Sequence, residues 1–460
     1  MVGWIQKRWN EEAGYRQLLV VAIPLILSMG SFSVLIFVDR VFLAHYSADA
    51  LAAAQPAGML NFSILCFFLG VSIYTSTFVA QYMGAKQPEK VGPSVWHGVY
   101  IGVIGGLSLP FFAPFATDIF AFIGHAPEVQ KDEAAFFRIL NFGAFFFLAN
   151  SAFSCFYSGR GKSWPIVWMN ISMTCLNILL DYLLIFGNFG FPRLGITGAG
   201  IATVTSSAFV TIAYLILFCR HSNNLRFQTR SSWRLQKRLL LRILRFGTPS
   251  GAHFFLDVMG FTVFVLLIGR IGTVELAASN IALNINLLSL LPMIGLGTAA
   301  SIMVGRFQGA RQSPLAVKTT YSALHMAVVH NTVMASLYWF APEILISPFI
   351  QETSGGDLPL IESTASSLLR YFAIIIFLDS LIIMTGGALK GAGDTRYVMT
   401  VLAFTSIFFL VIPAYILIEV LHQPASVAWI CAIVNLAVVA LAFSLRFRSR
   451  KWQNIDVIER

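Results

Sequence analysis

Four aspartates lie within long apolar stretches of the sequence, where a charged group is least expected. They are Asp39, Asp181, Asp257 and Asp379. A carboxylate at the centre of a bilayer costs about 2.5–3.5 kcal/mol on insertion scales, so such a residue is a functional candidate by default. Its chemistry would be the binding of a cation or a proton. A structural polar pair, or a position near the membrane interface, is the alternative for each, most of all for Asp39, which has Arg40 beside it.

Two further polar residues share a helical face with these acids. Asn177 lies four residues before Asp181, and His253 lies four residues before Asp257. Residues at this spacing are neighbours on one face of a helix. His253 could tune the neighbouring acid or sense pH; the alternative is a histidine that is hydrogen-bonded within the helix bundle.

The elements that position these residues are predicted to be membrane-spanning helices. Hydrophobic residues make up 57% of the chain and charged residues 11%, whereas a soluble domain carries about a quarter charged residues. Stretches long enough to cross about 30 Å of hydrocarbon predict twelve spans, near 17–44, 52–82, 95–123, 134–157, 164–187, 197–219, 244–269, 277–305, 317–341, 364–389, 397–420 and 425–445.

An internal repeat divides the spans into two sets of six. Residues 22–87 reappear without a gap as residues 247–312, and a fainter match sets 159–163 against 391–395. An even number of spans per half gives both halves the same orientation, so the expected fold is an all-α integral membrane protein of two parallel six-helix bundles, related by a pseudo-twofold axis along the membrane normal. The predicted parts are an N-terminal bundle (1–219), a basic linker (220–243), a C-terminal bundle (244–446) and a tail (447–460).

The net charge of +10 is concentrated in alternate loops and in both tails, which argues against nucleic acid as the partner. The side predicted to be external keeps only Arg40, Lys131, Arg138, Arg193, Arg270 and Arg370. By the positive-inside rule both termini are cytoplasmic, in a multi-pass protein of the cell's inner (plasma) membrane. The basic linker is expected to lie on the anionic inner leaflet, with a specific lipid or protein partner as the alternative. The first apolar run is too long for a cleavable signal.

Motifs along the whole chain resemble those of the multidrug and toxic compound extrusion (MATE) transporters, in particular their NorM-like branch. They are Pro24 with the later Phe37-Val38-Asp39, the run Gln81–Ala85, Phe246-Gly247-Thr248-Pro249 followed by an acid, Leu378-Asp379-Ser380, and Gly387–Thr395. Each motif is weak alone, but their order and spacing on a duplicated frame are specific.

The resemblance implies an antiporter that lets Na⁺ or H⁺ run inward and expels organic cations or amphipathic drugs, without a cofactor. Asp257 and Asp379 match the acidic pair of the C-terminal half that coordinates the coupling cation. In the N-terminal half, Asp39 and the Asn177–Asp181 pair match the family's polar cluster, to which Thr203 would add a hydroxyl. The acid at position 257 is typically Glu in this branch, so the shorter Asp257 changes the reach of that ligand.

Na⁺ could therefore bind at Asp257 and Asp379, or at Asp39 and Asp181. The expected partners are the transported compounds and membrane lipids, and the expected state is a monomer. A flippase for a lipid-linked substrate is the alternative function. An enzyme is not expected, because the sequence contains neither HExxH nor GxSxG. A passive channel fits two equivalent halves poorly.

Overall fold

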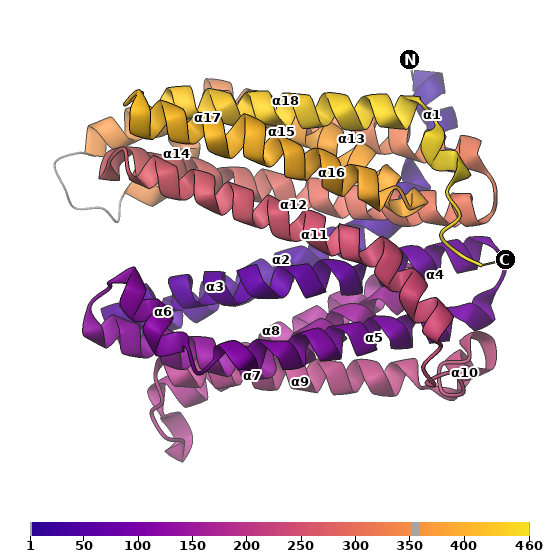
Figure 1. Ribbon diagram of the computed structural model, residues 1–460, viewed down its shortest axis with the longest axis horizontal. Helices are drawn as coiled ribbons and strands as arrows, with labels where there is room; N and C mark the ends of the chain where they lie inside the picture. The colour runs from indigo at the N-terminus through magenta and orange to yellow at the C-terminus, as the bar shows by residue number, and fades with distance from the viewer. Residues whose placement is uncertain (1, 351–357, 460) are drawn as a thin grey trace. The chain divides into compact units, whose positions relative to one another are not determined.

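The computed structural model describes residues 2–350 and 358–459, and helices make up nearly all of them (Figure 1). No strand occurs among the described residues. Eleven helical segments in the described part of the chain are long and apolar enough to span a membrane. This confirms the prediction of an all-α, multi-pass membrane protein.

The predicted count of twelve spans stays a prediction. A helix covers each predicted position, but α13 (Ser313–Phe340) falls outside the eleven described candidates. It is long enough to cross a bilayer, and it carries Lys318, His325, His330 and Asn331, which lower its mean hydropathy.

Contacts within the chain define two compact units. The N-terminal unit comprises the described residues from Leu27 to Phe255 and those from Val457 onward. Its helices are α3 (Ala48–Ile73), α4 (Thr75–Gly84), α5 (Val91–Ser108), α6 (Ala116–Ile123), α7 (Pro127–Ser158), α8 (Trp164–Phe186), α9 (Ile196–Phe218) and α10 (His221–Phe227), with 3₁₀ turns at Pro88–Lys90, Leu109–Phe112 and Asn188–Gly190.

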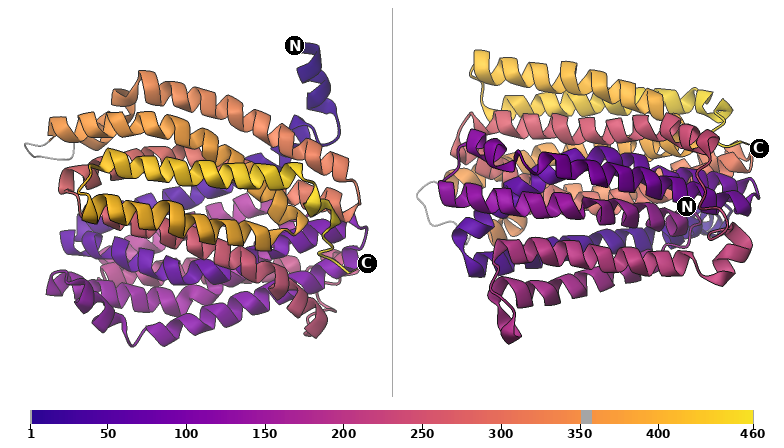
Figure 2. Two further views of the ribbon diagram at one scale, coloured as in Figure 1. Left: turned by 45° about the horizontal axis from the view of Figure 1, so that its top comes forward. Right: turned by 60° about the horizontal axis from the view of Figure 1, so that its bottom comes forward.

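The C-terminal unit comprises the described residues up to Ile26 and those from Leu256 to Asp456. Its helices are α1 (Val2–Asn10), α12 (Thr273–Gly309), α13, α14 (Pro342–Ile350), α15 (Leu358–Ala392), α16 (Thr395–Thr405), α17 (Ile412–Tyr415) and α18 (Ala425–Arg448), with a 3₁₀ turn at Lys451–Asn454. Within this unit α12, α13 and α18 pack along α15; the left view of Figure 2 shows the orange α15 between the salmon α13 and the yellow α18.

Two long helices contribute to both units. Helix α2 (Tyr15–Tyr46) passes from one unit to the other after Ile26, and α11 (Lys237–Gly269) does so after Phe255. Each has a proline in its interior, Pro24 in α2 and Pro249 in α11. A proline removes one backbone hydrogen bond and bends a helix, so each helix has a weak point near its change of unit.

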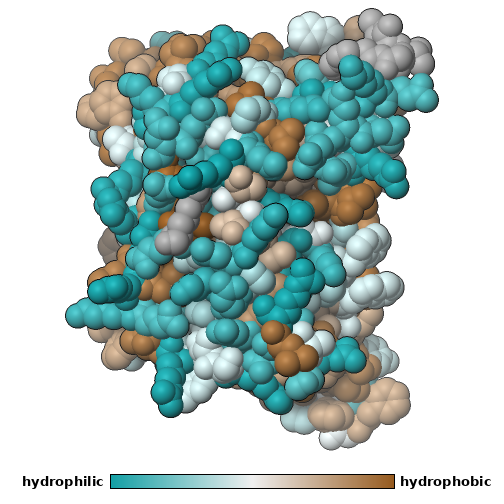
Figure 3. Space-filling model, turned by 90° about the vertical axis from the view of Figure 1, so that its right-hand side faces the viewer, coloured by the Kyte–Doolittle hydropathy of each residue, from teal (hydrophilic) through white to brown (hydrophobic). Residues whose placement is uncertain are grey.

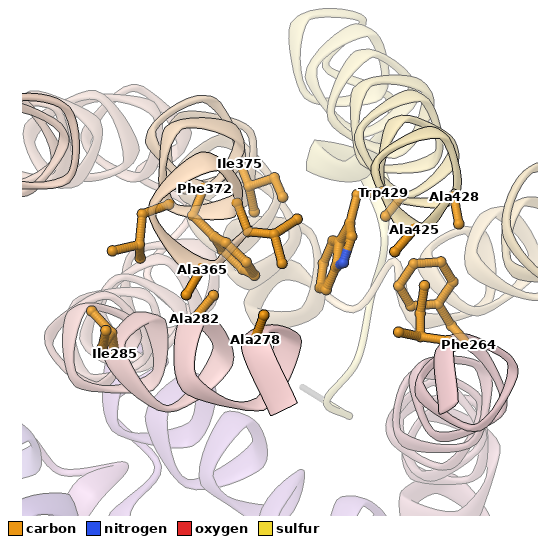
Figure 4. Packing of buried hydrophobic residues seen from close by; sticks show 14 of the residues in the cluster. Phe264, Ala278, Ala282, Ile285, Ala365, Phe372, Ile375, Ala425, Ala428 and Trp429 are labelled. Atoms are coloured by element: carbon orange, nitrogen blue, oxygen red, sulfur yellow. The ribbon is translucent and has the colours of Figure 1, made fainter. Parts of the chain in front are cut away.

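The C-terminal unit has an apolar core centred on Trp429 of α18 (Figure 4). The rings of Phe264 (α11) and Phe372 (α15) lie at 5.1 and 5.0 Å from it, edge to face. The indole Nε1 donates to Ser279 Oγ at 3.2 Å, so its polar edge is satisfied. Such a core fixes α11, α12, α15 and α18 as one rigid body.

A second proline effect appears in the helix that precedes α18. The segments Ser406–Val411 and Ile416–Val420 are π-helical, and α17 between them contains Pro413. Because proline has no N–H to donate, the hydrogen-bond ladder widens there.

Candidate functional site

Hydrogen bonds between α2 and α8 set these two helices side by side in the N-terminal unit. Asn170 Nδ2 donates to Ser28 Oγ at 2.6 Å, and Thr174 Oγ1 donates to the Ser31 carbonyl oxygen at 3.1 Å. The second bond lies further toward the C-terminus than the first on both helices, so the two helices run parallel.

Asp39 and Asp181 lie about two turns beyond Ser31 and Thr174, so this register places them at the same level of the two helices. Further along, the ring of Phe42 lies 6.5 Å from that of Tyr182, so the two acids are enclosed between the hydrogen bonds on one side and this aromatic contact on the other. The two carboxylates interact electrostatically. Asp181 is fully buried and Asp39 is half-buried.

The oxygens of this site have no protein partner. Within the described residues, Oδ1 of Asp39, both carboxylate oxygens of Asp181 and both polar atoms of the Asn177 amide are buried without a hydrogen bond. Such atoms are costly to bury. A proton or a hard cation would satisfy them, because carboxylate and amide oxygens are the ligands that hard cations prefer.

Thr203 lies at the level of this site but does not bond to it. Helices α8 and α9 run antiparallel and approach closely where Gly198 of α9 faces the backbone of Leu184 of α8. Asp181 lies about one turn from Leu184 on α8, and Thr203 lies about one turn from Gly198 on α9. Thr203 is half-buried, and its hydroxyl makes no hydrogen bond to Asp181 in the described part of the chain.

The second acidic pair lies in the C-terminal unit. Asp257 on α11 acts electrostatically on Asp379 of α15 and on Lys390. Asp379 and Lys390 are three turns apart on one face of α15, and both are half-buried. Asp257 is exposed. His253 is half-buried one turn before it.

The repeat shows that the two acidic pairs are not equivalent. Asp257 corresponds to Phe32 within the gapless repeat, and Asp379 corresponds to Phe147 when the offset of 232 between residues 159–163 and 391–395 is extended along the preceding helix. These two rings lie 6.3 Å apart, so an aromatic pair stands where the second half has its acids.

The reverse replacement occurs at the α2–α8 site. Asp39 corresponds to Phe264, which is fully buried in the core of Figure 4. Extending the offset of 232 along the following helix sets Asp181 against Pro413. Each half therefore has one acidic pair, and an apolar cluster occupies the position of the other.

Two features of the sites are not among the predictions from the sequence. Lys390 enters those predictions only as part of the Gly387–Thr395 motif, although its spacing from Asp379 places both on one face. The polar contact with α2 could also have been expected from a polar stripe on α8. Its members are three or four residues apart: Asn170, Thr174, Asn177 and Asp181.

Helices long enough to span a membrane, in two units that each contain an acidic pair, are the architecture expected of a membrane transporter. The family model MatE matches residues 24–183 and 249–416, so the chain belongs to the MatE family of multidrug resistance transporters. The resemblance inferred from the motifs is confirmed. Membership of this family makes the chain a transporter and not an enzyme.

Relatives are similar over nearly the whole chain. A probable multidrug resistance protein NorM of Xylella fastidiosa is 26% identical over 449 residues, covering 97% of this chain and 94% of that protein. A probable NorM of Thermotoga maritima is 26% identical and covers 92% and 89%.

Solved structures share the fold. An outward-facing multidrug resistance MATE transporter of the MOP superfamily superposes with a TM-score of 0.85 at 21% identity, over 97% of both chains. The eukaryotic MATE transporter AtDTX14 gives a TM-score of 0.83 at 21% identity, over 95% of this chain and 96% of that one.

Proposed function

We propose that this transporter expels organic cations and amphipathic drugs by antiport, with Na⁺ or H⁺ moving inward. The observation that carries the proposal is the Asp39–Asp181 pair, whose buried oxygens lack partners within the described residues. Carboxylate oxygens that receive no hydrogen bond from the protein attract a cation that reaches them. A coupling cation and a cationic drug would therefore compete for the same carboxylates.

Competition is sufficient for exchange. If the carboxylates are accessible to one side of the membrane at a time, the ion that binds from outside displaces the drug, and the drug that binds from inside displaces the ion. Each elementary charge that moves inward yields about 2.3 kcal/mol per 100 mV. No simultaneous binding is required.

The two sites differ in how well they suit Na⁺. The N-terminal site offers oxygens from Asp39, Asp181 and Asn177, with Thr203 at the same level, and this set fits a hard cation. The C-terminal pair includes Lys390 as an internal cation, and Asp257 has a shorter reach than the family's usual Glu. Na⁺ is therefore proposed at the N-terminal site, while a proton requires no particular reach and suits either.

The aromatic pair in the N-terminal unit suits the organic part of a drug. Phe32 is 41% exposed, so its ring is available to a planar molecule, and Phe147 lies beside it. Aromatic faces attract organic cations. We place the protein as a monomer in the inner membrane, with both termini cytoplasmic and lipids around its helices.

Dye efflux from reconstituted vesicles tests the proposal. A cationic dye is loaded, and an Na⁺ gradient and a pH gradient are imposed separately. The variants are Asp39→Asn, Asp257→Asn and Asp379→Asn, and Asp118→Asn, an exposed residue of α6, is the matched control. Na⁺-driven efflux lost only with Asp39 would place coupling in the N-terminal unit, and loss only with Asp257 or Asp379 would place it in the C-terminal unit.

Absence of gradient-driven dye movement in the native protein would refute drug antiport. That result would favour the flippase, because a lipid-linked substrate leaves the dye unaffected. Loss of efflux in the Asp118 control as well would show that the vesicles report protein stability rather than coupling.

A further inference from the structure

A basic pocket lies where α11 begins in the N-terminal unit. It has a volume of about 320 Å³, and four cations line it: Lys90, Lys237, Arg238 and Arg242. Lys90 comes from the end of a 3₁₀ turn and the other three from the first turns of α11. Figure 3, which faces the side of Figure 1 with α10 and the C-terminus, shows that hydrophilic side chains cover most of this surface.

One carboxylate opposes these four cations, and it belongs to the C-terminal tail. Glu459 lines the pocket, and its Oε1 lies 3.2 Å from Arg242 Nη1. Arg242 also donates through Nε to the Val457 carbonyl oxygen at 2.5 Å and through Nη2 to that of Ile458 at 3.1 Å. The buried side chains of Val457 and Ile458 hold this end of the tail in place.

The other three cations remain uncompensated. Within the described residues, the side chains of Lys90, Lys237 and Arg238 take part in no hydrogen bond or ion pair, and all three are exposed. Cations lining one concave surface raise the local positive potential. The pocket as a whole therefore has an excess of three positive charges that the protein does not neutralise.

The chemistry of the lining selects an oxyanion. Arginine guanidinium groups match the geometry of phosphate, and lysines bind phosphate as point charges. The partial positive charge at the start of α11 adds to this field. From Lys237 the helix continues into a membrane-spanning segment, so the pocket lies near the level of lipid headgroups, where basic pockets bind anionic lipids.

We propose that this pocket binds a phosphate oxyanion, and that Glu459 of the tail competes with it for Arg242. The phosphate belongs either to an anionic phospholipid or to a soluble phosphate compound. Glu459 satisfies Arg242 when the pocket has no ligand, and a bound phosphate takes over that cation. The binding does not depend on drug antiport.

The test uses the full-length protein in detergent micelles and measures thermal unfolding and native mass spectra. One arm adds phosphatidylglycerol against phosphatidylcholine, and the other adds inorganic phosphate against chloride at equal ionic strength. Saturable binding of phosphatidylglycerol alone identifies a lipid headgroup. Saturable binding of inorganic phosphate alone supports the proposal with a soluble phosphate compound as the ligand. Binding of both supports a site that accepts phosphate from either source, and binding of neither overturns the proposal.

Paired variants separate the pocket from the general basic surface. Lys237→Gln with Arg238→Gln should weaken binding by roughly 30-fold. The control, Arg230→Gln with Arg234→Gln, removes the same charge from the same linker outside the pocket and should change it less than about threefold. Equal weakening by both pairs would refute a defined site.

The tail provides an independent check that leaves all four cations of the pocket in place. Glu459→Gln removes the internal competitor and should strengthen binding by roughly three- to tenfold. Glu12→Gln, which makes the same change of charge at an exposed position of the C-terminal unit, should leave binding unchanged. An unchanged affinity in Glu459→Gln would overturn the competition.

Discussion

Asp181→Asn is expected to stabilise the protein while it abolishes transport. Asp181 is fully buried, and neither of its carboxylate oxygens has a hydrogen bond in the described part of the chain. The acid of the opposite helix, Asp39, adds repulsion. The resting protein therefore keeps an unfavourable group in this position, as is typical of residues retained for function.

The size of the effect follows from the two side chains. An aspartate at the centre of a membrane helix costs about 2.5–3.5 kcal/mol, and a buried amide about 1–3 kcal/mol. The amide introduced at position 181 could also donate to the buried Oδ1 of Asp39, which adds about 0.5–1.5 kcal/mol. We expect a net gain of about 1–3 kcal/mol, or a rise in Tm of roughly 2–12 °C for a unit of this size.

Thermal unfolding in detergent measures this gain, and Asp394→Asn provides the contrast. Asp394 is also buried, but its Oδ2 accepts a hydrogen bond from Arg446 Nε at 2.6 Å. Loss of that charged partner should destabilise the protein by about 1.5–3 kcal/mol. The same substitution thus has opposite signs at two buried aspartates. A lower Tm in both variants would refute the claim that Asp181 lacks a structural partner.

Three further predictions concern packing and surface charge. Phe264→Ala empties part of the apolar core around Trp429 and should lower the free energy of unfolding by about 3–5 kcal/mol, measured by thermal unfolding. Gly391→Ala should reduce the folded yield, because its Cβ would lie 2.2 Å from a backbone oxygen of α12, whereas Gly30→Ala meets nothing within 4 Å and should be tolerated; size-exclusion profiles compare the two. The ion pair with Lys318 lowers the pKa of Glu11, so its contribution is present above the ordinary carboxylate pKa and lost as pH falls through the lowered value. The Tm difference between native protein and Lys318→Gln should therefore shrink at acid pH.

The sequence predicted the elements well because hydropathy and the repeat are long-range signals. A helix covers each of the twelve predicted spans. The helix α13 differs from the other eleven because its polar residues lower its mean hydropathy. The crossing of α2 and α11 between the two units could not be predicted, since periodicity shows where a helix begins and ends but not which neighbours each part of it contacts.

The acidic residues and their grouping into two sites were predicted from the sequence and the family resemblance, but the helix contacts around them were not. An aspartate in an apolar stretch is visible in the sequence, because the membrane penalises it. The contact of Asn170 with Ser28 is harder to predict from the sequence, because the hydroxyl of a helical serine can also donate to a backbone carbonyl oxygen of its own helix. Only the packing of α2 on α8 distinguishes a polar stripe that faces a partner from one that is satisfied locally.

The exchange of acids for apolar residues across the repeat argues that the two halves have different tasks. If both halves performed one task, Asp39 would have an acid or an amide at its counterpart, and instead Phe264 is packed there against Trp429. A packed aromatic core cannot hold a cation, so that part of the C-terminal unit acts as a rigid body. The acids of that unit lie elsewhere, on α11 and α15, where the first half has only the rings of Phe32 and Phe147. Duplication thus supplied two copies of one helical frame, and substitution at four corresponding positions gave each copy its own charged site and its own apolar cluster.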